Sequence, residues 1–253
     1  MIKAVIFDMD GVIVDTEPLQ NESLKLLLDS YGIKPIYNEH GLLYTVGESG
    51  DASYHKFMKR HKITDDISHV REKRRKLFLS LIEKGLTPLP GFEDLIKNLQ
   101  KKDIKIGLAS NRLHEHVELM MDKIQARNHF QSIVGWNEKI NTKPAPDIYL
   151  LAAKKLKVLP EECVVIEDSE IGILAGKAAG MNVIAVPSTY TKHHNFSKAD
   201  KIVNSLTDIS EELINSFMNN QKITYEQAGV KYDSLDPAKK LAQEAAKRTA
   251  KNL

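Results

Sequence analysis

The stretch "KAVIFDMDGVIVDTE", residues Lys3 to Glu17, places acidic residues directly after a continuous apolar run. Residues 4–7 are all apolar, and Asp8 and Asp10 follow one residue apart. A run that is continuous rather than alternating is typical of a strand buried in a parallel sheet. Carboxylates this close together repel each other and lose hydration when buried. The stretch therefore predicts a buried strand. It also raises the question of which groups offset the charge repulsion and lost hydration of the acids at the end of that strand.

The composition is that of an ordinary globular protein. The chain has 253 residues, 42% hydrophobic and 28% charged, which is enough for one domain with an insertion or for two domains. The net charge of +2 gives no reason to expect a nucleic-acid or membrane partner. Cys163 is the single cysteine, and no secretory signal or long apolar segment is present, so we expect a cytoplasmic protein. The sequence leaves the oligomeric state open, with a monomer as the default.

Four further apolar runs are predicted to be buried strands. They are residues 105–109, 133–136, 164–166 and 183–186. Segments with helical spacing or helix-start signals lie between them, at residues 91–103, 146–158 and 169–180. Strands that alternate with helices imply right-handed crossovers. The predicted fold class is therefore α/β, with a doubly wound, Rossmann-like parallel sheet.

Residues 15–85 interrupt this alternation. They carry three helical patterns and no convincing buried strand, so we interpret them as a small α-helical cap inserted into the core. The core is then predicted to comprise residues 1–14 and 86–218. Residues 219–253 are polar, with Leu241 the main large apolar residue of a possible helix, and are predicted to form a partly helical tail.

Polar side chains follow several of the predicted strands. In a parallel α/β sheet, ligands bind outside the carboxyl ends of the strands, so these residues are predicted to meet at one edge. The set is Asp8 and Asp10 after the first strand, Ser110 and Asn111 after the second, Glu167 and Asp168 after another, and Lys143 before a helix start. Taken singly, each has a simpler interpretation as a helix cap, a turn residue or a surface lysine. Together, they predict a site.

This set of residues suits phosphoryl transfer assisted by a divalent cation. Clustered carboxylates raise one another's pKa unless a cation neutralises them, and hard oxygen ligands with room for water suit Mg²⁺. Lysine, serine and asparagine can bind the remaining phosphoryl oxygens. A carboxylate can act as the nucleophile, and a second acid two residues later can transfer a proton.

Four segments resemble the motifs of the haloacid dehalogenase (HAD) superfamily of hydrolases. They are "VIFDMDGVIVDTEPL", "IGLASNR", "TKPAPDIYLLAAKKL" and "CVVIEDSEIGILAGKAAGMNVIAV". The resemblance covers about residues 1–218 and is to the subgroup with a small helical cap. That subgroup contains β-phosphoglucomutase-like enzymes and small-molecule phosphatases.

The resemblance implies a role for each residue of the set. Asp8 would be the nucleophile and a Mg²⁺ ligand. Asp10 would be the general acid and base, with its backbone carbonyl on the metal. The phosphoryl group would be held by Ser110, Asn111 and Lys143, and the metal site completed by Asp168 together with Glu167. An acid at the position of Asp10 implies phosphate esters rather than dehalogenation.

The leading hypothesis is a phosphatase of small phosphomonoesters such as a sugar phosphate or phosphoglycolate. The alternative is a sugar phosphomutase, whose relatives carry a histidine and an arginine for a second phosphate. Here Gln20 and Gly50 stand at those positions, with the acidic Glu48 nearby, which favours hydrolysis. A non-catalytic protein that binds a phosphorylated metabolite is a third possibility. Arg74, within a basic run, is the cap residue that could touch substrate, whereas His193 and His194 are interpreted as loop residues.

Overall fold

The structure is a computed structural model that describes residues 1–35, 37–38, 41–42, 51–137 and 139–217, with side chains left undescribed at 37–38, 41–42 and 51–53. The predicted tail at 219–253 and the interpretations of Glu48 and Gly50 lie outside these residues. None of the helices in the described ranges is long and apolar enough to cross a membrane.

A six-stranded parallel sheet forms the centre of the fold, in the order β5-β4-β1-β6-β7-β8. Its strands are β1 (Ala4–Phe7), β4 (Lys105–Leu113), β5 (Ser132–Trp136), β6 (Cys163–Glu167), β7 (Asn182–Ala185) and β8 (Lys201–Ile202). The chain adds β4 and β5 on one side of β1 and then β6 to β8 on the other. Because the strand order reverses at β1, a crevice opens at the carboxyl ends of the central strands.

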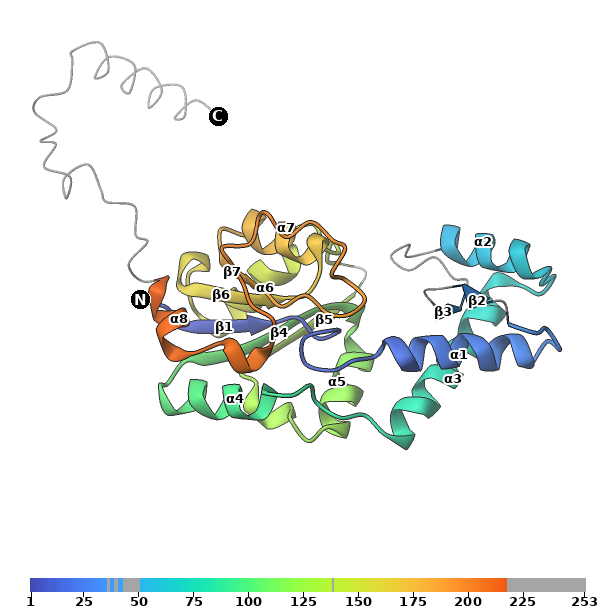
Figure 1. Cartoon of the computed structure of the whole chain (residues 1–253), viewed down its shortest axis with the longest axis horizontal. Coiled ribbons are helices and arrows are strands. Elements are labelled where there is room, and N and C mark those ends of the chain that lie inside the picture. Colours follow the sequence, from blue (N-terminus) through green and yellow to red (C-terminus); the bar gives the residue numbers. More distant parts are fainter. Residues whose placement is uncertain (36, 39–40, 43–50, 138, 218–253) are drawn as a thin grey trace, which may run out of the picture. The chain divides into compact units, whose positions relative to one another are not determined.

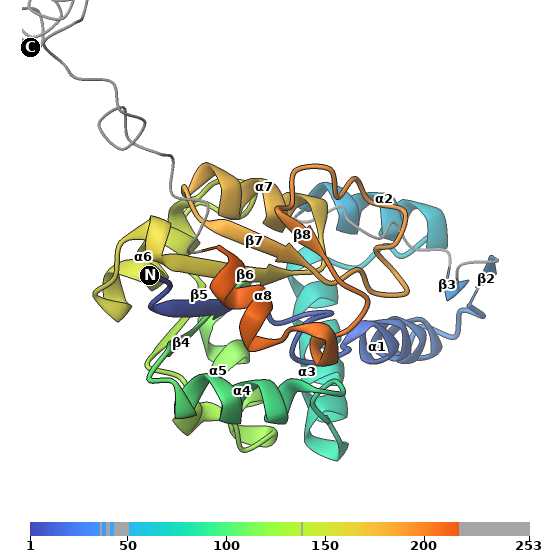
Figure 2. The same ribbon diagram turned by 60° about the vertical axis from the view of Figure 1, so that its left-hand side comes forward.

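Helices cover both faces of the sheet, as Figures 1 and 2 show. One face carries α4 (Phe92–Lys101) and α5 (His114–Lys123), and the other carries α6 (Asp147–Leu156) and α7 (Glu170–Ala178). The short helix α8 (Glu211–Ser216) and three 3₁₀ turns, Arg127–His129, Pro160–Glu162 and Leu206–Asp208, complete this part. The α/β fold with a Rossmann-like parallel sheet is thus confirmed.

Strand β1 shows why a continuous apolar run is needed. All four of its residues are fully buried, because β1 pairs with β4 and β6 at its edges and is covered on both faces. Ala4 and Ile6 belong to a core cluster that includes residues of α6. The ring of Phe7 packs edge-on against Phe92 and Phe130, with 6.1 Å between ring centroids in each case. Polar residues can enter this strand only at its end.

Two strands differ from the prediction. Strand β4 continues to Leu113, so Ser110 and Asn111 lie within the strand and the N-cap of α5 is Leu113. The simpler interpretation of Ser110 and Asn111 as a helix cap is therefore wrong. Strand β8 was not predicted, because Lys201–Ile202 is a two-residue exposed edge strand with no apolar run.

Residues 15–85 contain α1 (Glu17–Asp29), α2 (Asp51–His61) and α3 (Ile67–Lys84), as predicted from their helical patterns. They also contain a small antiparallel pair that was not predicted, β2 (Tyr37–Asn38) and β3 (Gly41–Leu42). Figure 1 shows these helices grouped at the side of the sheet where β1 ends. They share a hydrophobic cluster of their own, made of Leu24, Leu27, Leu28, Phe57, Met58, Ile63 and Val70. The division into core, cap and tail stays a prediction.

Candidate active site

The residues predicted to form a site line one cavity of about 350 Å³ at the carboxyl ends of the strands. Asp8 and Asp10 reach it from the end of β1, Ser110 and Asn111 from β4, and Glu167 and Asp168 from β6. Lys143 reaches it from the loop before α6. All seven predicted residues are therefore brought together, as expected from the meeting of parallel strands at one edge.

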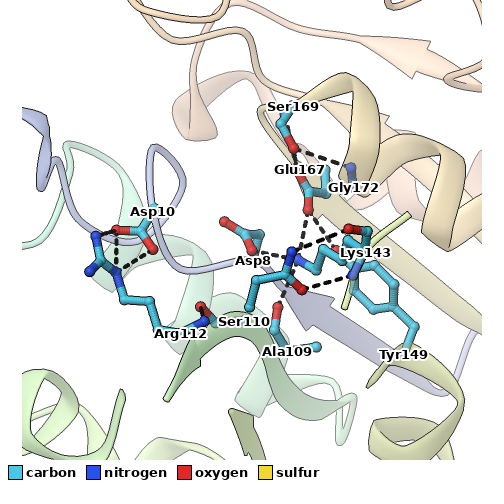
Figure 3. A network of polar contacts seen from close by, with 11 residues as sticks. Asp8, Asp10, Ala109, Ser110, Arg112, Lys143, Tyr149, Glu167, Ser169 and Gly172 are labelled. Atoms are coloured by element: carbon cyan, nitrogen blue, oxygen red, sulfur yellow. Dashed lines mark hydrogen bonds and ion pairs between the residues drawn. The ribbon is translucent and has the colours of Figure 1, made fainter. Parts of the chain in front are cut away.

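Lys143 lies at the centre of the buried part of the site (Figure 3). Its ammonium donates hydrogen bonds to Asp8 Oδ1 at 2.5 Å, to Glu167 Oε1 at 2.7 Å and to the carbonyl oxygen of Ala109 at 2.9 Å. The side chains of Lys143 and Glu167 are only 2% and 1% exposed. Burial alone would lower the pKa of Lys143, but the charges of Asp8 and Glu167 outweigh it and raise that pKa. Lys143 is thus a permanently charged cation shared by two carboxylates.

Glu167 has its hydrogen-bonding capacity filled by the protein. Oε1 accepts from Lys143 and from the Tyr149 hydroxyl at 2.9 Å, and Oε2 accepts from the backbone N–H and hydroxyl of Ser169 at 3.0 and 2.9 Å. A Cβ at Gly172 would lie 1.7 Å from Oε1, so only glycine leaves room for this carboxylate. With two bonds at each oxygen, Glu167 fits a metal site better through a bridging water than as a direct ligand.

Asp168 is held against the turn that follows β1. Gly11 has φ +77, and a Cβ there would lie 2.2 Å from Asp168 Oδ2. The glycine after Asp10 therefore serves both the turn and the close approach of this carboxylate. Oδ2 also accepts a hydrogen bond from the Thr191 hydroxyl at 3.2 Å.

The carboxylates at the end of β1 and β6 carry more negative charge than the residues around them neutralise. Burial raises the pKa of Asp8 well above its ordinary value; the charge of Lys143 opposes this, and that of Glu167 adds to it. Burial, with the charge of Glu167, raises the pKa of Asp168 to about 7. Asp8, Glu167 and Asp168 each bring an oxygen within 4.8 Å of the others. An all-oxygen, electron-rich group of this kind fits a hard divalent cation such as Mg²⁺.

Ser110 and Asn111 support the loop that carries Lys143 and the strand end. The Asn111 side chain accepts from the Lys143 backbone N–H at 2.9 Å and donates to the Lys143 carbonyl at 3.4 Å. The Ser110 hydroxyl accepts from the backbone N–H of Arg112 at 3.2 Å. Both residues also line the cavity, so they are placed to meet a ligand as well as to hold the backbone.

Asp10 has a different environment from the other acids. The Arg112 guanidinium donates to both of its carboxylate oxygens at 2.7 to 2.9 Å, and the Thr16 hydroxyl donates to Oδ1. Thr16 is the N-cap residue of α1 but makes no side-chain cap bond, because its hydroxyl is used by Asp10. Burial would raise the pKa of Asp10, but the charge and hydrogen bonds of Arg112 lower it below its ordinary value.

Several lining residues were missed by the sequence analysis. Arg112 lies in the segment "IGLASNR" directly after Ser110 and Asn111, and the structure places it in β4. Tyr190, Thr191, His193 and His194 come from the loop after β7 and line the same cavity. The two histidines are loop residues, as interpreted, but the loop forms a wall of the site. The residues of this loop could have been predicted to line the site, because they follow a strand that ends at the same edge of the sheet.

On the cap side, Gln20 and Arg74 contact each other. Arg74 donates to Gln20 Oε1 at 2.7 Å and to the Tyr54 hydroxyl at 3.2 Å. Neither residue lines the cavity in this arrangement. Arg74 is thus not among the residues that line the cavity with Ser110, Asn111 and Lys143.

The chain is similar in sequence and in structure to known proteins. A family model described as haloacid dehalogenase-like hydrolase matches residues 5–186. The bifunctional riboflavin kinase/FMN phosphatase of Arabidopsis thaliana is 34% identical over 209 residues, which are 82% of this chain and 54% of that protein. The chain thus spans about half the length of this relative.

A second relative and a solved structure match over most of their own lengths. The phosphorylated carbohydrates phosphatase of Thermotoga maritima is 33% identical over 187 residues, covering 72% of this chain and 84% of that protein. A crystal structure of a CbbY mutant from Rhodobacter sphaeroides, in complex with xylulose-(1,5)bisphosphate, has a TM-score of 0.71 and 27% sequence identity. The structural match covers 83% of this chain and 97% of that one.

Proposed function

The chain belongs to the haloacid dehalogenase-like hydrolases, and on that premise we propose that it is a Mg²⁺-dependent phosphatase acting through an aspartyl-phosphate on Asp8. Family membership and the class of phosphoric monoester hydrolase, both predicted from the sequence, are confirmed by the relatives. The metal, the covalent step and the substrate belong to the proposal. A cytoplasmic location stays a prediction from the composition.

The observation that carries the proposal is the position of Asp8 beside Lys143. Asp8 Oδ1 accepts the 2.5 Å hydrogen bond from Lys143. Among the residues that the structure describes, none donates a hydrogen bond to the other oxygen, Oδ2, and Asp8 lines the cavity. One carboxylate oxygen is thus held while the other is available to attack phosphorus.

In the first step, Asp8 Oδ2 attacks the phosphorus of the ester and the bond from phosphorus to the ester oxygen breaks. The leaving oxygen takes a proton from Asp10, which must first take one up from solvent because Arg112 keeps its carboxyl ionised in the free protein. Lys143, Ser110 and Asn111 lie around the cavity and hold the phosphoryl oxygens, whose charge grows in the transition state.

In the second step, the Asp10 carboxylate removes a proton from a water molecule, which attacks the phosphorus of the aspartyl-phosphate. The bond between phosphorus and Asp8 breaks, inorganic phosphate leaves and Asp8 is regenerated. Asp10 again carries the proton with which the cycle began, so the protons balance.

The metal would be held by Asp8 and Asp168 through their side chains, by Asp10 through its backbone carbonyl, and by Glu167 through water. When bound, Mg²⁺ would lower the pKa values of the buried carboxylates and offset the charge of the phosphoryl group. The raised pKa values of Asp8 and Asp168, caused first by burial and then increased by neighbouring carboxylates, support a cation at this place.

Small phosphorylated sugars are the proposed substrates. The Thermotoga relative is named for phosphorylated carbohydrates, and the CbbY structure contains a sugar bisphosphate. A cavity of about 350 Å³ suits a ligand of this size. Hydrolysis is preferred to mutase action because Gln20, which stands where the mutase relatives carry a histidine, does not line the cavity.

The proposal is tested by measuring phosphate release from sugar phosphates, 2-phosphoglycolate and nucleoside monophosphates, with Mg²⁺ and with EDTA. We expect release that requires Mg²⁺ and that falls by about 10³-fold or more in Asp8→Asn. Asp10→Asn should lower kcat strongly as well. Asp122→Asn, an exposed aspartate on α5, is the matched control and should keep full activity.

Two outcomes would contradict the proposal. Full activity of Asp8→Asn would exclude the covalent step on this residue. Interconversion of hexose 1- and 6-phosphates without release of phosphate would identify a mutase instead.

A further inference from the structure

Arg112 joins the proposed acid to the segment that follows it. Its Nε donates to both carboxylate oxygens of Asp10 at 2.9 and 2.7 Å, and its Nη2 donates to Asp10 Oδ1 at 2.8 Å. Nη2 also donates to Thr16 Oγ1 at 3.0 Å. The guanidinium carbon lies 4.9 Å from the ring centroid of Phe78 on α3. One arginine thus contacts the acid, the start of α1 and helix α3.

In this arrangement Arg112 engages both carboxylate oxygens of Asp10. At least part of this pairing must therefore open before Asp10 can act on substrate. The Arg112 side chain is only 18% exposed. A guanidinium left in such a place without an anion loses hydration that nothing replaces, so the opening requires a new partner for Arg112.

The charges that line the cavity indicate where that partner comes from. The lining carboxylates are Asp8, Asp10, Asp15, Glu17, Glu167 and Asp168, and the lining lysine and arginine are Lys143 and Arg112. Lys143 is already paired with Asp8 and Glu167. Arg112 is therefore the cation that an entering anion can reach by displacing a single carboxylate. The phosphoryl group that reacts must lie at Asp8, so the anion at Arg112 is a different one.

We infer that Arg112 is an exchangeable clamp, which holds Asp10 in the free enzyme and releases it to a second anionic group, a carboxylate or a phosphate, on the phosphomonoester. A guanidinium binds either group through two parallel hydrogen bonds. This inference rests on the proposed function and narrows its substrate class to phosphomonoesters with two anionic groups. For an ester with one, Glu17 is the protein carboxylate nearby whose charge also acts on Arg112.

The first test measures binding with the chemistry switched off. Asp8→Asn with Mg²⁺ is titrated calorimetrically with two pairs of ligands, 2-phosphoglycolate against 2-hydroxyethyl phosphate and fructose 1,6-bisphosphate against fructose 1-phosphate. In at least one pair, the ligand with two anions should bind about 10-fold or more tightly. Adding Arg112→Met should reduce this preference to about 2-fold or less, and Arg112→Lys should keep part of it.

The second test measures turnover with Asp8 intact. In Arg112→Met, KM for the preferred two-anion ester should rise about 10-fold. The KM for its one-anion counterpart should rise by no more than about 2-fold, because that ester has no second anion for Arg112 to bind. Arg127→Met is the matched control, since Arg127 is ion-paired with Glu118 at 2.5 Å outside the cavity. Thermal unfolding of each variant checks that it is folded.

Three results would overturn the inference. They are an absence of preference in both ligand pairs, a preference unchanged by Arg112→Met, and an equal loss of kcat for both members of a pair. Failure of the proposed function looks different. If binding shows an Arg112-dependent preference but no ester releases phosphate, hydrolysis is refuted and the anion site is supported. If phosphate is released but no preference is found, hydrolysis is supported and the anion site is refuted.

Discussion

Two groups of charges share one cavity and are built differently. Lys143 and Glu167, with Asp8, form a buried cluster in which the lysine and glutamate side chains are 2% and 1% exposed. Asp10 and Arg112 form a pair whose side chains are 33% and 18% exposed. The buried cluster is fixed by many hydrogen bonds, whereas the pair contacts water and can exchange partners. On our proposals, the first group holds the reacting phosphoryl group and the second responds to the substrate.

The electrostatic consequences are also opposite. Burial raises the pKa values of Asp8 and Asp168, and the charge of Glu167 adds to both shifts. Arg112 lowers the pKa of Asp10 despite its burial. The carboxylates of the buried cluster are therefore expected to bind a further cation. Asp10, in contrast, is expected to separate from Arg112 before it acts.

The largest expected effect is that of Lys143→Met. Removing the buried ammonium leaves Asp8 and Glu167 without their shared partner, so the free energy of unfolding should fall by about 3–5 kcal/mol in EDTA. Mg²⁺ should restore more stability to this variant than to the wild type, because it replaces part of the lost charge. Urea denaturation with and without Mg²⁺ measures both effects.

Two variants serve as references for Lys143→Met. Lys97→Met, at an exposed position on α4, should change stability by no more than about 0.5 kcal/mol. Arg112→Met should cost less than Lys143→Met, because its pair is partly hydrated. Equal losses for Lys143→Met and Arg112→Met would show that the two groups do not differ as described.

Gly172→Ala should give the next largest effect, and it acts on the buried cluster alone. The new Cβ would lie 1.7 Å from Glu167 Oε1, so the carboxylate must move out of its four hydrogen bonds. We expect Mg²⁺ affinity to fall by about 10- to 100-fold, as for other residues that orient a metal site. The Mg²⁺ dependence of the unfolding temperature measures it independently of turnover.

Glycine-to-alanine changes inside helices ordinarily stabilise by about 1 kcal/mol, so a loss at Gly172 points to its contact rather than to helix propensity. Gly85→Ala is the control, since nothing lies within 4 Å of a Cβ there. Wild-type Mg²⁺ affinity in Gly172→Ala would contradict the role given to Glu167.

The pH dependence of stability should distinguish the carboxylates whose pKa is raised by burial from Asp10, whose pKa is lowered by Arg112. Folded protein keeps a proton on Asp168 up to about pH 7, whereas the unfolded chain loses it near pH 4. The folded state therefore binds more protons over this interval, and the free energy of unfolding in EDTA should fall as pH rises from about 5 to about 8.

Asp168→Asn should reduce that fall, and saturating Mg²⁺ should reduce it in the wild type. Asp10→Asn should change it less than Asp168→Asn does, since the lowered pKa of Asp10 keeps it ionised in both states above about pH 5 and only its charge acts on Asp168. Urea denaturation at several pH values checks this, and an identical profile for Asp168→Asn and wild type would contradict the assignment.

The smallest effect is expected on removing residues 222–253. Every residue assigned to the site lies between Asp8 and His194, so kcat and KM should stay within about 2-fold of the full-length values. Steady-state kinetics of the truncated chain measures this. A large loss of activity would mean that the tail contributes to the site.

The fold and the residues of the buried cluster could be predicted from the sequence for the same reason. Continuous apolar runs mark strands covered on both faces, and the residues after them must meet at one edge of a parallel sheet. Asp8 and Glu167 were found in this way, and Lys143 was found by its position before a helix start, although their roles stay proposals. Strand β8 lacked such a run and was missed.

The hydrogen bonds that distinguish the two groups were not accessible. Arg112 and Asp10 are 102 residues apart, and nothing in the local sequence "SNR" places the arginine beside the acid. Likewise, four donors fill both oxygens of Glu167, which a list of acids at strand ends cannot show. These contacts depend on side-chain packing between distant segments rather than on local pattern.

The covalent step at Asp8 is tested most directly by trapping the phosphoenzyme. The full-length protein is mixed with Mg²⁺ and a substrate from the panel, quenched in acid during turnover, digested and analysed by mass spectrometry. One phosphoryl group should appear on the peptide that contains Asp8, and it should be absent from Asp8→Asn. Active turnover with no phosphoryl group on that peptide, or with the group on another residue, would contradict the mechanism.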